Sequence, residues 1–320
     1  MLILSRHDVE AVLDVRTCVP AMEAALAGLS RGTWRQPPRT QVRIDGSGIL
    51  MGLMPAFRDA GARVLALKDI LLVPDNRARG LQTHQGAVLL HDGASGALLA
   101  IVDAAALTEI RTAAVSAVAT RALARPDTAK VAILGTGVQA RRHVEAMRMI
   151  LPAAEIVVWG RTPDHAAALC EQMDVRACGS VEAAVAGAGV ICTVTASPVP
   201  VLDLAPVAPD CHVNAIGASS PATREIAADL VASAALCVDS RTQADAECGE
   251  YLLAIRDGAI GPGHIRAELG DVLLGRVPGR TDSGGITLFK SLGLGVEDLA
   301  AAEAAVIAAT RSGIGTRVEW

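Results

Sequence analysis

The 320-residue chain is poor in aromatic residues and has no long run of basic ones. It contains one tyrosine, two phenylalanines and three tryptophans, and its formal net charge is −5. Proteins that bind nucleic acids usually present a basic surface and aromatic side chains on which bases stack. The composition therefore argues against nucleic acid as the main partner. The length allows large hydrophobic cores and favours two domains over one.

The seven cysteines include no C-x-x-C pair and no spacing typical of a metal site. Their number is odd, which argues against a complete set of disulfides. This pattern predicts reduced, mostly buried thiols in a cytoplasmic protein, with no metal centre.

The sequence also lacks signals for export or membrane insertion. The first residues, MLILSRHDVE, have neither the basic start nor the long apolar stretch of a signal peptide. Segment 183–202 is uncharged, but it contains two glycines, two prolines and three hydroxyl side chains, which suit hydrocarbon poorly. We therefore expect a soluble protein with no membrane partner.

The first part of the chain, about 1–112, mixes helical and strand-like segments. A helix is expected over 17–32, with a hydroxyl residue at its start and a glycine at its end. Short β-like runs follow at 40–44, 49–54, 63–68, 87–90 and 98–102. The turn-rich segment 91–96 predicts a hairpin, so this part is expected to form an antiparallel α+β domain.

The middle of the chain shows the alternation typical of a parallel sheet. Strand-like runs at 131–134, 155–159, 190–194, 212–216 and 236–239 alternate with helical stretches at about 138–150, 164–173 and 180–187. The pattern predicts an α/β Rossmann domain, a doubly wound parallel sheet, over 113–299. An alanine-rich helix at about 103–125 joins the two parts. From about 285 onward we expect helix, with 300–320 returning to the first domain.

A glycine-rich turn follows the first strand of the predicted Rossmann domain. Residues 135–140 read Gly-Thr-Gly-Val-Gln-Ala, which matches G-x-G-x-x-A after an apolar strand and before a helix. The glycines permit a tight turn, and the helix N-terminus offers N–H groups and a positive dipole end to a pyrophosphate. We therefore expect Gly135, Thr136, Gly137, Val138 and Gln139 to bind a nicotinamide dinucleotide.

The end of the second strand indicates which dinucleotide is preferred. NAD-binding folds usually place an acidic residue here for the ribose hydroxyls, but this chain has Arg161 and Thr162. A guanidinium suits the 2′-phosphate of NADP(H), which is therefore favoured over NAD(H). The alternative is that Thr162 only caps the next helix, with Pro163 in its first position and Arg161 in solvent.

Further strand ends are expected to line the same crevice. Ligands of such sheets bind beyond the carboxyl ends of the strands. Thr195, Ile216 and Gly217 follow apolar strands and are therefore candidate cofactor contacts, although small polar residues are common at any strand–loop junction.

Three basic residues of the first part are candidates for binding an anion. Arg111 shares a helical stripe with Val115 and Val118, so it is expected to face inward, where a carboxylate is a suitable partner. Lys68 and Arg43 end strand-like runs. Each of the three could instead be a surface cation or part of a structural ion pair.

Several segments of the chain resemble the ornithine cyclodeaminase/mu-crystallin family. They are Lys68-Asp69, QTHQG at 82–86, LTEIRTAAVSA at 107–117, VNAIGAS at 213–219, AELGDV at 267–272 and ITLFKSLG at 286–293. The resemblance runs from about 38 to 300, in register with the glycine-rich turn. Members include ornithine and lysine cyclodeaminases, an alanine dehydrogenase and NADPH-dependent ketimine reductases, and they are typically homodimers that pair through the first domain.

The resemblance implies roles for individual residues. Arg43 and Arg111 match the arginines that hold the substrate carboxylate, and Lys68 matches a catalytic lysine. Thr112 and Ser291 match cofactor contacts near the nicotinamide. Cyclodeaminases carry an aspartate where this chain has Ser219, whereas the mu-crystallin-like reductases tend to have serine there, and Arg-Thr after the second strand. Met51, Thr83 and His84 complete the expected substrate pocket.

The expected activity is the NADPH-dependent reduction of a cyclic ketimine carboxylate to a cyclic L-amino acid. The candidate substrates are 1-pyrroline-2-carboxylate and 1-piperideine-2-carboxylate. Redox-neutral ornithine or lysine cyclodeamination with NAD is the main alternative. Amino acid dehydrogenation is a second one, and a non-catalytic NADPH-binding protein is a third.

Overall fold

The chain divides into two compact units, which we describe separately on a computed structural model. The structure describes residues 1–281 and 284–319, without the side chain of Arg77. Unit 1 comprises Met1–Arg111 and the chain from Gly293 onward, and unit 2 is Thr112–Leu292. The chain thus rejoins unit 1 at Gly293, earlier than the expected return at about 300, and this brings the start of the last helix into unit 1.

Unit 1 contains one mixed sheet. Its strands are β1 (Leu2–Leu4), β2 (Trp34–Arg35), β3 (Thr40–Arg43), β4 (Leu50–Arg58), β5 (Val64–Leu72), β6 (His84–Asp92), β7 (Leu98–Asp103) and β16 (Thr316–Arg317). The order is β16-β1-β7-β6-β5-β4-β2, and β3 also pairs with β4. The pairing is antiparallel except between β1 and β7, and β6 and β7 form the hairpin that the sequence predicts.

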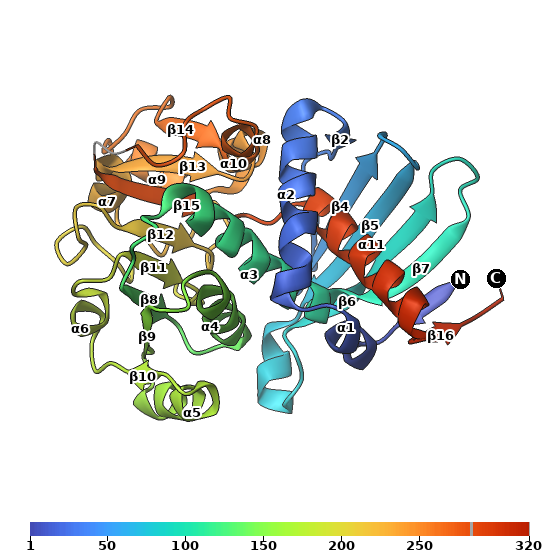
Figure 1. Cartoon of the computed structure of the whole chain (residues 1–320), viewed down its shortest axis with the longest axis horizontal. Coiled ribbons are helices and arrows are strands. Elements are labelled where there is room, and N and C mark those ends of the chain that lie inside the picture. The colour runs from blue at the N-terminus through green and yellow to red at the C-terminus, as the bar shows by residue number, and fades with distance from the viewer. Residues whose placement is uncertain (282–283, 320) are drawn as a thin grey trace. The chain divides into compact units, whose positions relative to one another are not determined.

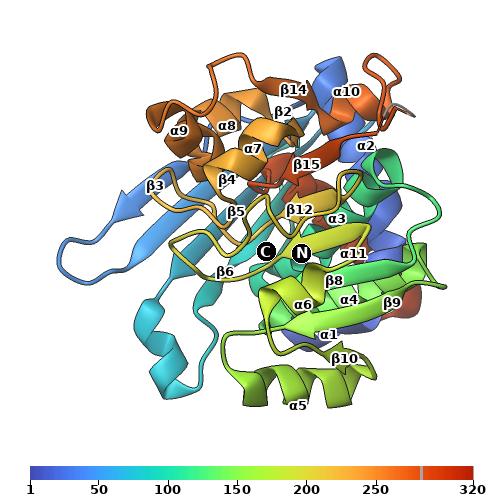
Figure 2. The same ribbon diagram turned by 90° about the vertical axis from the view of Figure 1, so that its left-hand side faces the viewer.

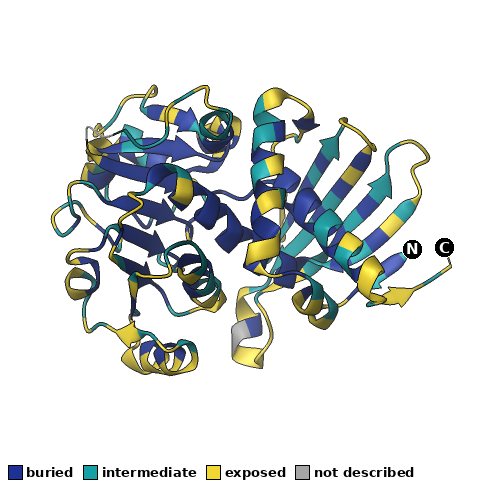
Figure 3. Ribbon diagram, viewed as in Figure 1, coloured by how far each residue is buried: buried dark blue, intermediate teal, exposed yellow. Residues whose placement is uncertain are grey.

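Helices cover one face of this sheet. They are α1 (Arg6–Val12), α2 (Val15–Arg31) and α11 (Gly295–Ser312), and a 3₁₀ helix spans Pro74–Arg79. Helix α11 packs on β4, β5 and β6 and against α2 (Figure 1). Burial alternates along the strands, as Figure 3 shows: Val64, Ala66 and Lys68 of β5 are buried, whereas Leu65 and Leu67 are not. Lys68 therefore lies on the helix-covered face.

Unit 2 contains a wholly parallel sheet. Its strands are β8 (Lys130–Leu134), β9 (Glu155–Trp159), β10 (Arg176–Ala177), β11 (Val190–Thr193), β12 (His212–Ala215), β13 (Ala234–Val238), β14 (Ile265–Glu268) and β15 (Ile286–Lys290). The order is β10-β9-β8-β11-β12-β15-β13-β14. The chain order reverses between β8 and β11, which is the switch point of a doubly wound sheet and the usual place of a bound ligand.

Within the described residues, eight helices accompany these strands, and the first of them, α3, begins in unit 1. They are α3 (Ala104–Leu123), α4 (Val138–Ile150), α5 (Pro163–Met173), α6 (Val181–Val185), α7 (Ala228–Ser233), α8 (Arg241–Glu247), α9 (Gly249–Arg256) and α10 (Leu269–Leu273). Helices α4 and α6 both pack on β8 and β9, on opposite faces of the sheet (Figures 1 and 2). The predicted fold class, a Rossmann sheet with an additional α+β unit, is confirmed.

The helix expected from about 285 onward is wrong over its first part. Residues Ile286–Lys290 form strand β15, which is fully buried and lies between β12 and β13. A short apolar run has no periodicity that separates a buried strand from a helix segment. Helix begins only at Gly295, after Gly293 has turned the chain with φ of 77°.

Candidate active site

Lys68 and Arg111 meet two carboxylates at the start of α11. Lys68 Nζ lies 3.2 Å from Asp298 Oδ1, and Arg111 Nε donates to the same oxygen over 3.0 Å. Arg111 Nη1 donates to Glu297 Oε2 over 3.1 Å. All four side chains are at most 6% exposed. The expected inward orientation of Arg111 is therefore what the structure shows.

The two carboxylates were not anticipated from the sequence. Glu297 and Asp298 lie in the first turn of α11, where the helix dipole stabilises negative charge. An acidic first turn is also the ordinary start of an exposed helix, so the pattern alone does not reveal burial. The additional signal is the apolar segment before it, Leu292 and Leu294, because both leucines are buried and draw the helix start inward.

A third cation, Arg39, belongs to the same group. Arg39 Nη2 donates to the carbonyl of Gly293 over 3.2 Å, and its charge acts on Lys68. A Cβ added at Gly293 would come within 2.8 Å of Arg111 Nη2, so the glycine permits the close approach of that guanidinium. When all five groups are charged, Lys68, Arg111, Arg39, Glu297 and Asp298 carry one net positive charge, which favours binding of an anion.

The environment of Lys68 lowers its proton affinity. Burial is the largest effect and lowers the pKa of Lys68, the negative charge of Asp298 raises it, and the charges of Arg111 and Arg39 lower it again. The resulting pKa is about 8, below the ordinary 10.5. A lysine with such a pKa can both donate and accept a proton near neutral pH.

Arg43 is not brought to this group. It is exposed on β3, and its Nη2 donates to Gln41 over 3.3 Å. Arg43 pairs with Leu50, whereas Lys68 pairs with Met54, four residues further along β4. The structure thus does not place Arg43 in the group of Lys68 and Arg111, and Arg39, from the segment before the same strand, is the arginine that it brings there.

The remaining expected pocket residues lie on the same sheet. Met51 is half-buried on β4, and Thr83 Oγ1 lies 3.2 Å from His84 Nδ1 at the start of β6. The pKa of His84 is lowered, mainly because the imidazole is partly desolvated and also because of the positive charge of Lys68. His84 therefore interacts electrostatically with Lys68 and stays a candidate pocket residue.

The glycine-rich turn of unit 2 has the geometry that a dinucleotide needs. Gly135 has φ of 135°, and a Cβ there would lie 2.7 Å from the carbonyl oxygen of Val194. Only glycine fits this position without displacing the next strand end. Gly137 is the N-cap residue of α4, so the helix N-terminus opens beside Thr136, Val138 and Gln139. The turn fits a bound pyrophosphate.

The expected contacts at strand ends share one edge of the sheet. The register aligns Leu134, Thr193, Ala215 and Lys290, so the residues that follow them lie at the same carboxyl edge. These followers include Gly135, Thr195, Ile216, Gly217 and Ser291. The residues predicted to contact the cofactor therefore lie together at one edge of the sheet.

A buried carboxylate, Glu225, joins two of these strand ends. Its oxygens accept hydrogen bonds from Thr193 Oγ1 at 2.9 Å, from Thr195 N and Oγ1 at 2.6 Å each, and from Gly217 N at 2.5 Å. Burial raises the pKa of Glu225, while Lys290 and these donors lower it. Glu225 was not predicted, because an isolated acid in a polar loop segment looks like a surface residue.

The other expected cofactor residues are placed as follows. Arg161 and Thr162 are exposed beyond β9, and Thr162 is the N-cap residue of α5, with Pro163 next. Thr112 is buried in α3 directly after Arg111. Ser219 is exposed four residues after β12 ends.

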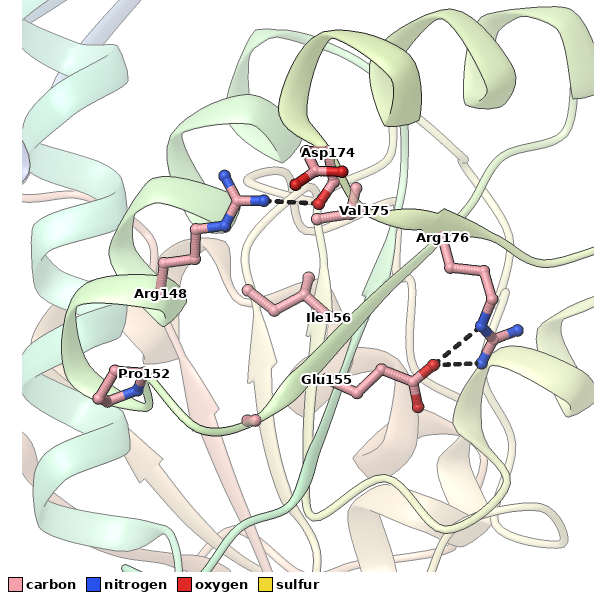
Figure 4. A pocket seen from close by; sticks show the side chains of 8 residues that line it. Arg148, Pro152, Glu155, Ile156, Asp174, Val175 and Arg176 are labelled. Carbon is pink, nitrogen blue, oxygen red and sulfur yellow. Dashed lines mark hydrogen bonds and ion pairs between the residues drawn. The ribbon is translucent and has the colours of Figure 1, made fainter.

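A surface cavity of unit 2 lies elsewhere. Its volume is about 750 Å³, and it is lined by residues at the amino end of β9, away from the strand ends described above (Figure 4). Its two arginines are already engaged: Arg148 donates to the Asp174 carbonyl, and Arg176 pairs with Glu155. Within the described residues there is also no cluster of His, Cys, Asp and Glu suited to a metal.

Comparison with known proteins decides the family. The model of the ornithine cyclodeaminase/mu-crystallin family matches residues 1–310. The chain belongs to this family. Ketimine reductase mu-crystallin of Mus musculus is 41% identical over 290 residues, covering 89% of this chain and 90% of the mouse protein.

Solved structures agree over the whole length. Thermococcus litoralis Δ(1)-pyrroline-2-carboxylate reductase, in complex with NADH and L-proline, has a TM-score of 0.94 at 31% identity, covering 99% of this chain and 100% of that one. An archaeal alanine dehydrogenase dimer with bound NAD has a TM-score of 0.93 at 29% identity, covering 100% and 99%. The family resemblance is therefore confirmed, and the protein is an oxidoreductase.

Proposed function

We propose that this family member reduces a cyclic ketimine carboxylate with NADPH, giving the cyclic L-amino acid. 1-Pyrroline-2-carboxylate and 1-piperideine-2-carboxylate are the candidate substrates. The observation that carries the proposal is the group formed by the buried Lys68 and Arg111 with the half-buried Arg39, because it combines a candidate proton donor with two guanidinium groups that suit a carboxylate. Two of the relatives named above, the mouse ketimine reductase and the Thermococcus litoralis Δ(1)-pyrroline-2-carboxylate reductase, are reductases of this class of compound.

Arg111 and Arg39 hold the substrate carboxylate in this proposal. A guanidinium binds a carboxylate through two parallel hydrogen bonds, which fixes orientation as well as position. Holding the substrate in one orientation removes much of the entropic barrier to reaction at the C=N carbon. Arg39 takes this role in place of Arg43, because Arg39 acts on Lys68 and Arg43 points to solvent.

Lys68 supplies the proton. With a pKa of about 8 it is mostly protonated at neutral pH and can protonate the ring nitrogen, which makes the C=N carbon more electrophilic. In the reverse direction the neutral amine takes the proton from the ring N–H. His84 is the first residue of β6 and pairs with Leu72 of β5, the strand that carries Lys68, and Thr83 precedes it.

The glycine-rich turn fits a nicotinamide dinucleotide. The backbone at Gly135 leaves no space for a side chain, and the turn lies open to a pyrophosphate at the N-terminus of α4. When bound, the nicotinamide supplies hydride to the substrate carbon or takes it back. Gly137, Val138 and Gln139 would hold the pyrophosphate, and Thr195, Gly217 and Ser291 lie at the edge expected for the nicotinamide.

NADPH is preferred over NADH in this proposal because of Arg161 and Thr162. Both are exposed directly after β9, where an acid would bind an unphosphorylated ribose. The solved relatives named above contain NADH or NAD, so the preference depends on these two residues of this chain alone.

Two other activities use related chemistry. Ornithine or lysine cyclodeamination is disfavoured by Ser219, which stands where the resemblance places the aspartate of the cyclodeaminases. Amino acid dehydrogenation is supported by the likeness to the archaeal alanine dehydrogenase. All three activities need a carboxylate clamp and a lysine, so the substrate assay has to separate them.

We further propose that the protein is a homodimer that pairs through the uncovered face of the unit 1 sheet. Pro55, Leu67, Leu89 and Ile101 are paired in register across four strands on that face, and Leu65 and Leu99 are each 42% exposed on it. An apolar sheet face of this kind is usual at subunit interfaces. The alanine dehydrogenase relative is described as a dimer.

We also propose that the protein is cytoplasmic. All seven cysteines are free thiols, as suits a reducing compartment. No helix of residues 1–281 and 284–319 is long and apolar enough to cross a membrane.

A single assay series tests the proposed activity. The purified enzyme is given NADPH or NADH with each ketimine carboxylate, and L-ornithine with NAD⁺ while ammonia is measured. We expect NADPH oxidation with at least one ketimine and no ammonia from ornithine. Lys68→Met should lower turnover by about 10³-fold while nucleotide binding is unchanged. Ammonia release without net reduction, or full activity of Lys68→Met, would overturn the proposal.

A further inference from the structure

One oxygen of Asp298 is shared by two cations of the active site. Oδ1 lies 3.2 Å from Lys68 Nζ and 3.0 Å from Arg111 Nε, and the Asp298 side chain is 1% exposed. The other oxygen, Oδ2, is buried and accepts no hydrogen bond from the described residues. The negative charge of this buried carboxylate is therefore neutralised by Lys68 and Arg111. If Lys68 loses its proton, the charge of Asp298 is balanced less well.

We propose that Asp298 is a positioning residue that holds the Lys68 ammonium in place and keeps it charged. This inference rests on the proposed function, because Lys68 has to be charged only if it delivers the proton. Asp298 acts through Lys68 and does not itself contact the reacting atoms. Its place in the first turn of α11 suits this role, since the helix dipole favours a carboxylate rather than a neutral acid there.

Two other cations act on Lys68 and favour loss of its proton: Arg111 comes from α3 and Arg39 from the segment before β3. His84 of β6 is close enough for the charge of Lys68 to lower the pKa of the imidazole. The two arginines repel an ammonium, and burial removes its hydration. Asp298 of α11 is the carboxylate in direct contact with Lys68, so it is the group that offsets these effects.

Glu297 provides a matched control. It is the neighbouring residue of the same helix turn and is equally buried, but it pairs with Arg111 and with the backbone N–H of Leu294. Replacing either acid by its amide keeps the shape and removes one charge. Only the change at Asp298 removes the direct partner of Lys68.

The test is a pH titration of Lys68 in the free enzyme, which is monitored by NMR on protein that carries ¹³C-labelled lysine. The Lys68 signal is assigned by its loss in Lys68→Met. We expect Asp298→Asn to lower the pKa of Lys68 by about one unit or more, as removal of a contacting opposite charge should. Glu297→Gln should lower it by less than half as much. Asp298→Ser is a second variant without the charge, for use if Asp298→Asn does not fold.

Two results would overturn the inference: an unchanged Lys68 pKa in both Asp298 variants, or an equal shift in Glu297→Gln. Kinetics add a second readout. The pH above which the rate of ketimine reduction falls should decrease together with the pKa of Lys68. The titration needs no substrate. If the wild-type enzyme reduces no ketimine, the proposed function fails while the titration still decides the role of Asp298.

Discussion

At the scale of single residues, the choice between Arg39 and Arg43 can be tested directly. Arg39→Gln removes one carboxylate-binding side chain, so KM for the ketimine should rise about 10- to 100-fold, the usual effect of losing a hydrogen bond to a charged group. Arg43→Gln is the matched control on the same segment and should change KM less than twofold, since Arg43 is exposed. Steady-state kinetics decide, and the opposite ranking would restore Arg43 to the site.

The pKa of Lys68 determines how the rates depend on pH. Reduction needs the protonated amine, so its kcat/KM should be level below pH 8 and fall above it, because the pKa is about 8. Oxidation of the cyclic amino acid needs the neutral amine and should rise over the same range. Measuring both directions between pH 6 and about 10 checks this. A reduction rate that is flat through pH 8 would contradict the role of Lys68.

These residues also show how far the sequence could define the site. Arg111 was predicted because a charge on an apolar helical face needs an anion, and Lys68 because it ends a strand-like run and matches a catalytic lysine of the family. The structure places both in one buried group. Arg39 was missed because it precedes a strand and shares its segment with Arg43, and spacing alone does not separate them. Glu297 and Asp298 were missed because their burial arises from tertiary contacts of α11.

At the scale of secondary structure, a neutral histidine anchors the helix that follows the glycine-rich turn. His143 Nδ1 donates to the carbonyl of Gln139 over 2.8 Å, so Nε2 accepts from Ser116 Oγ of α3 over 2.9 Å. Burial lowers the pKa of His143 to about 4, from 6.5. The folded state therefore binds this proton less readily than the unfolded chain, and stability is lost as pH falls below 6.5.

The size of this effect follows from the shift. Because one pH unit over which only the unfolded chain is protonated corresponds to about 1.4 kcal/mol, His143 should lower the free energy of unfolding at pH 5 by about 2 kcal/mol relative to pH 7. Urea unfolding at the two pH values measures it. His143→Gln should be less stable at pH 7 but should lose about 2 kcal/mol less on acidification. An equal loss in both proteins would show that His143 does not titrate in this way.

Prediction from sequence succeeded for elements with a clear period and failed for one without. The alternation of β8, α4, β9 and α5 gave the Rossmann sheet, because amphipathic helices and flanking turns mark each boundary. Strand β15 was read as helix, since its five residues are all buried and show no alternation. Its place between β12 and β13 depends on pairing with strands distant in sequence, and a local pattern carries no such information.

At the scale of the whole molecule, the uncovered sheet face of unit 1 predicts a dimer. Light scattering should give twice the 32.8 kDa mass of one chain. Changing Leu65 and Leu67 of β5 to arginine places two like charges on the face, and each is repeated in the second copy, so the dimer should dissociate at micromolar concentration. Ile307→Arg is the control, because Ile307 is 52% exposed on α11, the helix that covers the opposite face of the sheet. If Ile307→Arg dissociates the dimer and the β5 variant does not, the subunits pair through the helical side.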